Sequence, residues 1–138
     1  MADGNGTKLA GRANYQSNEY VFAMDNASAS THNLEVGDSG KTYFVKNDVA
    51  RTINLPAPAA GVCFKFIMTD TTTDSSLVAT GALFKGGAEC GDAYLTLAGT
   101  TIVLEAEGSV GDWLEIVSDG TYWYVSGHGA HDASFSVS

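Results

Sequence analysis

Residues 111–127 read GDWLEIVSDGTYWYVSG, and this segment decides the fold class of the chain. Two runs rich in β-branched and aromatic residues flank Asp119-Gly120, a dipeptide that favours the two positive-φ positions of a type I′ turn. The segment therefore predicts a β-hairpin whose strands are joined by a two-residue turn.

The alternation of side chains gives this predicted hairpin two different faces, because successive residues of a strand point to opposite sides. One face is apolar beyond the pair at its turn end, and its predicted pairs are Ser118–Thr121, Ile116–Trp123 and Leu114–Val125. The other face mixes rings with polar groups, and its predicted pairs are Val117–Tyr122, Glu115–Tyr124 and Trp113–Ser126. We expect the first face to join the core and the second to be a hydrated surface or a subunit contact.

Short runs with the same two-residue period recur along the chain. The best core strand is residues 62–69, where Val62, Phe64, Phe66 and Met68 alternate with Cys63, Lys65 and Ile67. Residues 51–55 place Arg51, Ile53 and Leu55 on one side. Other expected strands are residues 20–24, 31–36, 42–46, 77–80, 93–97, 101–106 and 134–137, whereas the glycine-rich residues 81–92 predict a long loop.

No window of the sequence carries an apolar stripe of helical period, and turn residues recur at spacings typical of sandwiches. We therefore expect an all-β fold, a β-sandwich or jelly-roll-like single domain with about ten short strands. This domain covers residues 20–138. Residues 1–19 are rich in Gly, Asn and Ala, and predict a flexible N-terminal arm.

Charge is distributed unevenly along the chain, whose net charge is −9. No Lys or Arg follows Lys85, whereas eight acidic residues do. Such a field repels a phosphate backbone, so nucleic acid is not an expected partner. The sequence has no apolar run of membrane-spanning length and no leader-like start, so we expect neither a membrane nor a secretory signal.

Potential metal ligands and catalytic groups are scattered. Cys63 is expected to be a small buried thiol and Cys90 a loop thiol, not a disulfide pair. His128 and His131 supply half a metal site, which three copies on a trimer axis could complete. The loop of residues 70–74 could hold calcium only weakly. A solvated tail and a turn are the expected roles of these segments, so we expect no metal and no cofactor.

No acid–base pair indicates catalysis. Glu105 and Glu107 share a strand face near Asp112 and Glu115, and we interpret them as a solvated acidic face. The Gly37-Asp38-Ser39-Gly40 run is similar to a serine-protease nucleophile motif, but His32 is the single histidine before it and the serine comes too early in the chain. We expect no enzyme.

The aromatic face formed by Trp113, Tyr122 and Tyr124 allows three interpretations. Rings with polar tips are enriched at binding hot spots, so burial between subunits is one. A platform that stacks on sugars is the second, and ordinary partial burial is the third.

The order of parts resembles a small β-domain that is frequent in tailed bacteriophages, in capsid decoration proteins, head fibres and tail fibres. The resemblance covers roughly residues 37–127. It depends on the Gly37–Gly40 turn, the segment INLPAPAAG at residues 53–61, the aromatic strand that follows, and the hairpin at residues 111–127.

This resemblance implies a virion structural protein, commonly a homotrimer, with no shared active site. The expected function is capsid decoration: cementing the outer surface of a phage-type capsid by binding the major capsid protein, after assembly in the host cytoplasm. Lys8 and Arg12 of the arm would contact the shell, and the acidic C-terminal part would face outward. The alternative is a receptor- or glycan-binding module at the tip of a viral fibre or spike.

Overall fold

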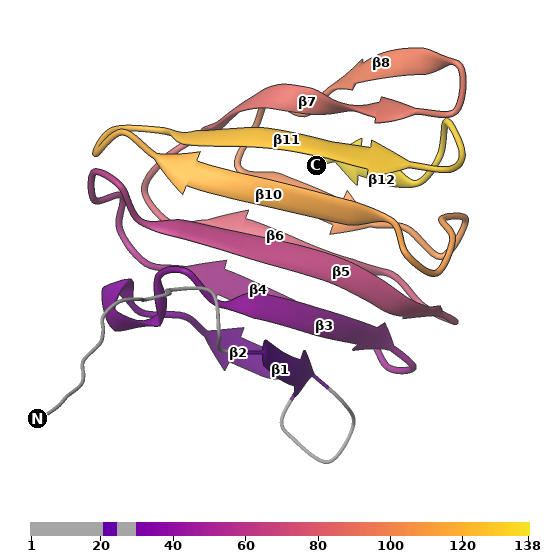
Figure 1. The fold of residues 1–138 in the computed structure, drawn as a ribbon, viewed down its shortest axis with the longest axis horizontal. Coiled ribbons are helices and arrows are strands. Elements are labelled where there is room, and N and C mark those ends of the chain that lie inside the picture. The colour runs from indigo at the N-terminus through magenta and orange to yellow at the C-terminus, as the bar shows by residue number, and fades with distance from the viewer. Residues whose placement is uncertain (1–20, 25–29) are drawn as a thin grey trace, which may run out of the picture.

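Short strands alternate between two β-sheets that pack face to face in this computed structural model, which describes residues 21–24 and 30–138 (Figure 1). The seven-stranded sheet has the order β1 (Val21–Met24), β3 (Thr42–Asn47), β5 (Cys63–Thr71), β10 (Trp113–Ser118), β11 (Trp123–Gly129), β7 (Phe84–Cys90) and β8 (Ala93–Thr96). The five-stranded sheet has the order β12 (Phe135–Val137), β9 (Thr101–Leu104), β6 (Ser75–Ala79), β4 (Thr52–Leu55) and β2 (Thr31–Asn33). The predicted all-β sandwich is confirmed, and the described residues contain twelve strands.

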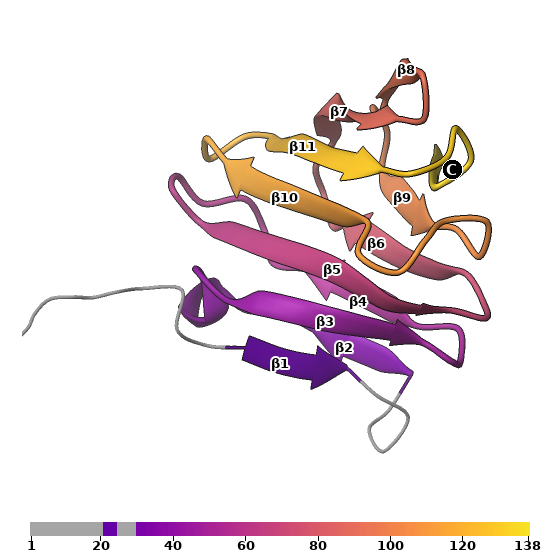
Figure 2. The same ribbon diagram turned by 45° about the vertical axis from the view of Figure 1, so that its right-hand side comes forward.

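The chain crosses between the two sheets at every step from β2 to β7, as the turned view shows (Figure 2). Strands that follow one another along the chain are therefore often not neighbours. This path makes β3 and β5 parallel neighbours in one sheet, and β4 and β6 parallel neighbours in the other. The described residues contain no helix long and apolar enough to cross a membrane.

The core lies between the sheets and is built by the inward residues of each alternating strand. Its large side chains include Phe64 and Phe66 of β5, as the sequence predicted, together with Phe84, Trp123 and Phe135. The ring centroids of Phe64 and Trp123 lie 5.9 Å apart. Each such ring removes apolar surface from water, which is the main stabilising contribution to a fold of this kind.

The predicted two-residue turn of the β10–β11 hairpin is wrong. Ser118 pairs with Trp123 and Ile116 pairs with Val125, so residues 119–122 form a four-residue loop. The Asp119 carboxylate accepts hydrogen bonds from the backbone N–H groups of Thr121 and Tyr122, both at 2.8 Å, and these bonds hold the wider loop. The register shifts by two residues, an even number, so the predicted faces of both strands remain correct.

The predicted long loop at residues 81–92 is also wrong, because Phe84–Cys90 forms strand β7 between β11 and β8. The glycines that suggested a loop permit close strand contact instead. A Cβ atom at Gly87 would clash with the carbonyl oxygen of Leu95 in β8. Cys90 is consequently a buried strand thiol, not a loop thiol.

The N-terminal part differs from the prediction in detail. The strand expected at residues 31–36 ends at Asn33, and Val36–Asp38 forms the 3₁₀ helix η1. The expected flexible arm, residues 1–19 with Lys8 and Arg12, lies outside the described residues.

Candidate binding faces

The outer face of the seven-stranded sheet carries its side chains in rows across the strands. The middle row is polar, and the strand register aligns Thr42, Lys65, Glu115 and Ser126 in it. The row on one side is mainly apolar and consists of Phe44, Ile67, Trp113 and His128. The row on the other side consists of Cys63, Val117, Tyr124 and Lys85. We call this surface the large-sheet face.

A groove of about 610 Å³ lies over the middle row. Its lining includes all four residues of that row, with Tyr124 and Val117 on one side and Ile67 on the other. The volume is within the usual range of small-ligand sites. Cys63 also lines this groove and is half-buried, so the prediction of a small buried thiol is wrong. Cys63 and Cys90 are both free thiols, as expected.

The aromatic residues predicted as one face occupy two positions. Trp113 and Tyr124 lie on the large-sheet face, whereas Tyr122 lies in the loop of the hairpin. The Tyr122 and Tyr124 rings meet edge to face with centroids 6.5 Å apart. Lysine ammonium groups lie over two of the rings, Lys65 at 4.8 Å from Trp113 and Lys85 at 4.0 Å from Tyr122.

Tyr124 is an exposed ring with two polar or aromatic neighbours, Asp119 and Tyr122. Its side chain is 42% exposed, and its hydroxyl group hydrogen-bonds to the Asp119 carboxylate. Desolvation, followed by this carboxylate, raises the pKa of Tyr124. The backbone N–H groups of Tyr122 and Thr121 lower the pKa of Asp119, so the carboxylate stays ionised and available to the hydroxyl. The ring is therefore exposed, with Asp119 and Tyr122 as its neighbours.

The charges that line the groove nearly cancel. Lys65 lies directly opposite Glu115 in the register of β5 and β10. Lys41, at one end of the groove, forms an ion pair with Asp38 at 2.6 Å. That hydrogen bond from Lys41 is the main reason why the pKa of Asp38 is lowered.

The outer face of the five-stranded sheet has no charged residue at its outward strand positions among the described residues. One row crosses all five strands and consists of Thr31, Thr52, Ser76, Val103 and Ser136. The second row consists of Asn33, Asn54, Val78 and Thr101. The amides of Asn54 and Asn33 are hydrogen-bonded at 2.8 Å. The carboxylate of Glu105, the residue that follows β9, accepts a hydrogen bond from the Ser136 hydroxyl of the first row, so acidic groups border this surface at one end. We call this surface the small-sheet face.

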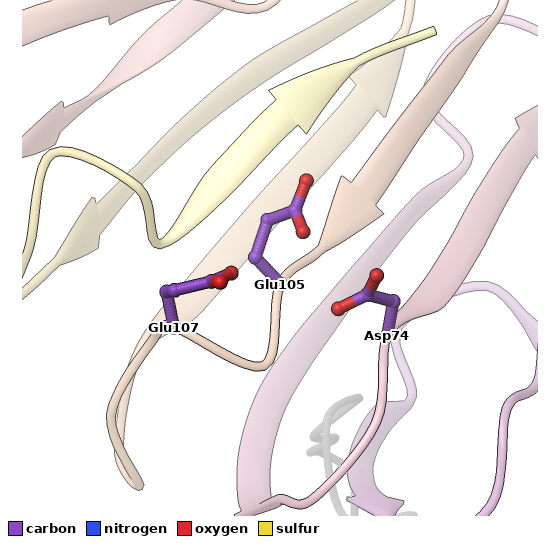
Figure 3. Close-up of side chains that lie close together, drawn as sticks. All are labelled: Asp74, Glu105 and Glu107. Carbon is purple, nitrogen blue, oxygen red and sulfur yellow. The ribbon is translucent and has the colours of Figure 1, made fainter.

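Three carboxylates gather at the end of the five-stranded sheet, as Figure 3 shows. Asp74, just before β6, lies with Glu105 and Glu107, just after β9, and one oxygen of each is within 4.8 Å of the others. Asp74 also accepts a hydrogen bond from the backbone N–H of Ala106 at 2.8 Å. The two acidic segments that the sequence presented separately are thus neighbours, because β6 and β9 pair.

No other group of three potential metal ligands occurs in residues 30–138. His128 and His131 are both exposed, and the structure brings no third ligand to them. Asp112, counted with the solvated acids in the sequence, is instead buried and accepts backbone hydrogen bonds from Ser109 and Ala130.

Sequence reasoning placed Trp113, Tyr124 and Ser126 on one face of the hairpin but did not connect Lys65 and Thr42 with them. The pairing of β10 with β5, and of β5 with β3, was the signal that it lacked, since these strands are far from the hairpin in the sequence. Comparisons of the chain with models of known families, with characterised proteins and with solved structures find no match.

Proposed function

We propose that the protein is a virion structural protein of the decoration type, which binds the outer surface of a phage-type capsid and stabilises it without catalysis. The observation that supports this proposal best is the small-sheet face, whose outward strand positions carry no charge across five strands in a chain of net charge −9. Its nearest charges are the carboxylates at one end, where Glu105 accepts a hydrogen bond from Ser136. Charged residues are depleted at the centre of protein interfaces, because their desolvation is costly.

The hydroxyl and amide groups of this face suit a flat protein partner. Ser76 lies on β6, the central strand of the five-stranded sheet, and Thr52 lies beside it on the next strand, β4, so a shell subunit on this face would cover both. Short hydroxyl side chains lose little conformational entropy on burial, and they can donate to and accept from backbone groups of the partner. The proposed partner is the major capsid protein, and the proposed assembly on the shell is a homotrimer.

Residues 1–19 are a second proposed contact with the shell, through Lys8 and Arg12. They precede β1, an edge strand of the large sheet that pairs in parallel with β3. Removal of residues 1–19 leaves every strand of the sandwich in place. We expect the truncated protein to fold as the full chain does and to bind shells more weakly.

The test is co-sedimentation with undecorated shells of the major capsid protein encoded with this chain. Thr52→Arg places a charge on the small-sheet face, and Thr42→Arg makes the same change on the large-sheet face. We expect Thr52→Arg to abolish shell binding, because a buried unpaired charge costs several kcal/mol. Equal binding by the two variants contradicts the small-sheet face as the contact, and no binding by the unaltered chain contradicts the function.

A further inference from the structure

The large-sheet face lies on the opposite side of the sandwich from the small-sheet face, so shell binding leaves the groove over Lys65 and Glu115 open to solvent. Three features of this groove identify the chemistry of a ligand: an exposed ring, a row of hydrogen-bonding groups, and charges that nearly cancel.

The ring is that of Tyr124, which has Asp119 and Tyr122 as neighbours. A tyrosine ring with such neighbours has fewer side-chain conformations to lose when a ligand stacks on it. Sugars present a face of C–H groups that packs on such rings, while their hydroxyl groups remain available at the edge.

The polar row supplies partners for those hydroxyl groups. Glu115 lies on β10 diagonally across from Tyr124, and diagonal neighbours on paired strands lie about 7–8 Å apart. Lys65 lies directly opposite Glu115, and Thr42 and Ser126 extend the row to both sides. Across four strands the row spans about 14 Å, the sum of three strand spacings. The row thus places hydrogen-bonding groups beside the apolar side chains of Val117 and Tyr124. A short chain of sugar rings needs both, because its hydroxyl groups form hydrogen bonds and its C–H faces pack on apolar surface.

Other ligand classes fit less well. A peptide that binds by strand addition needs an unpaired edge, and the groove lies over β5 and β10, whose backbones are paired on both sides. Phosphate-bearing chains need a surplus of cations, whereas Lys65 faces Glu115 and Lys41 is paired with Asp38.

We propose that this groove binds neutral oligosaccharides, with a sugar ring stacked on Tyr124 and its hydroxyl groups bound by Glu115 and Lys65. The inference goes beyond decoration, since it uses the opposite face and does not depend on shell binding.

The experiment measures binding of neutral trisaccharides (maltotriose, cellotriose and chitotriose) and of the acidic sialyllactose, by saturation-transfer NMR and then calorimetry. An array of bacterial-surface polysaccharides and animal glycans identifies the source of the sugar. We expect at least one neutral sugar to bind, and Tyr124→Ala to weaken it by about tenfold or more. Glu115→Gln also weakens binding, and Ser126→Arg blocks the groove.

Tyr94→Ala is the matched control, because Tyr94 is 62% exposed on β8 of the same sheet and does not line the groove. It should bind as the unaltered chain does. Three results overturn the proposal: no neutral sugar binds, only sialyllactose binds, or Tyr94→Ala loses as much affinity as Tyr124→Ala. Thr52→Arg should keep full sugar binding, so loss of shell binding and loss of sugar binding are separate outcomes.

Discussion

Replacing Asp112 by alanine should destabilise the domain strongly, although the residue lies in an acidic, loop-rich segment. The carboxylate is 3% exposed. One oxygen accepts a hydrogen bond from the Ser109 N–H at 2.9 Å and the other from the Ala130 N–H at 3.0 Å. Asp112 therefore joins the loop before β10 to the loop after β11.

The magnitude follows from these two bonds. A hydrogen bond to a charged group contributes about 1.5–3 kcal/mol, and Asp112→Ala removes two. Ala130 is exposed, so water can bind its N–H group in place of the lost carboxylate. We therefore expect the free energy of unfolding to fall by about 3 kcal/mol. For a domain of this size that corresponds to a fall in Tm of about 10–15 °C.

The assay is urea unfolding followed by tryptophan fluorescence, since Trp123 is fully buried and reports loss of the core. Asp112→Asn keeps one acceptor and should lose roughly half as much stability as Asp112→Ala. Asp92→Ala, an exposed aspartate, should change stability by less than about 0.5 kcal/mol. If Asp112→Ala costs no more than Asp92→Ala, the carboxylate does not hold these loops.

Three further predictions use the same assay. Arg51→Met should cost about 3 kcal/mol, because it breaks a buried pair at 2.8 Å but leaves Asp48 with partial access to water; a neutral result would refute the pairing. Gly87→Ala should cost about 1–3 kcal/mol through overpacking against β8, whereas Gly37→Ala, with open space around it, should be neutral; similar values for both would refute the steric argument. Burial, and then the charge of Arg51, lower the pKa of His32 below its usual 6.5. The folded state therefore binds a proton less readily than the unfolded state, and stability falls as pH drops below about 6.5. His32→Gln should flatten that dependence, and an unchanged slope would show that other groups cause it.

The alternation of side chains predicted the fold class and most of the faces. It placed Phe64, Phe66 and Met68 in the core correctly, and it placed Arg51 on the same inward side as Ile53 and Leu55. An arginine at such a position can be buried because Asp48 and the Lys46 carbonyl accept its N–H groups. The alternation of inward and outward side chains can be read from the sequence of one strand, without knowledge of the strands that pair with it.

Features that depend on contacts between distant segments were not predictable in this way. The glycines of β7 indicated a loop, because nothing in their own segment shows that β8 and β11 approach closely enough to exclude a side chain. The polar row of the groove joins β3, β5, β10 and β11, and the carboxylate cluster joins β6 and β9. Asp119 is compatible with both a two-residue turn and a four-residue loop, and hydrogen bonds to its carboxylate stabilise the four-residue loop.

Variants of the two faces distinguish which side of the sandwich contacts the shell. The measurement is the fraction of protein that sediments with undecorated shells, for the unaltered chain, Thr52→Arg and Tyr124→Ala. If the small-sheet face is the contact, Thr52→Arg stays in the supernatant while Tyr124→Ala sediments like the unaltered chain. The opposite pattern would mean that the groove face contacts the shell, and would contradict the assignment of both faces.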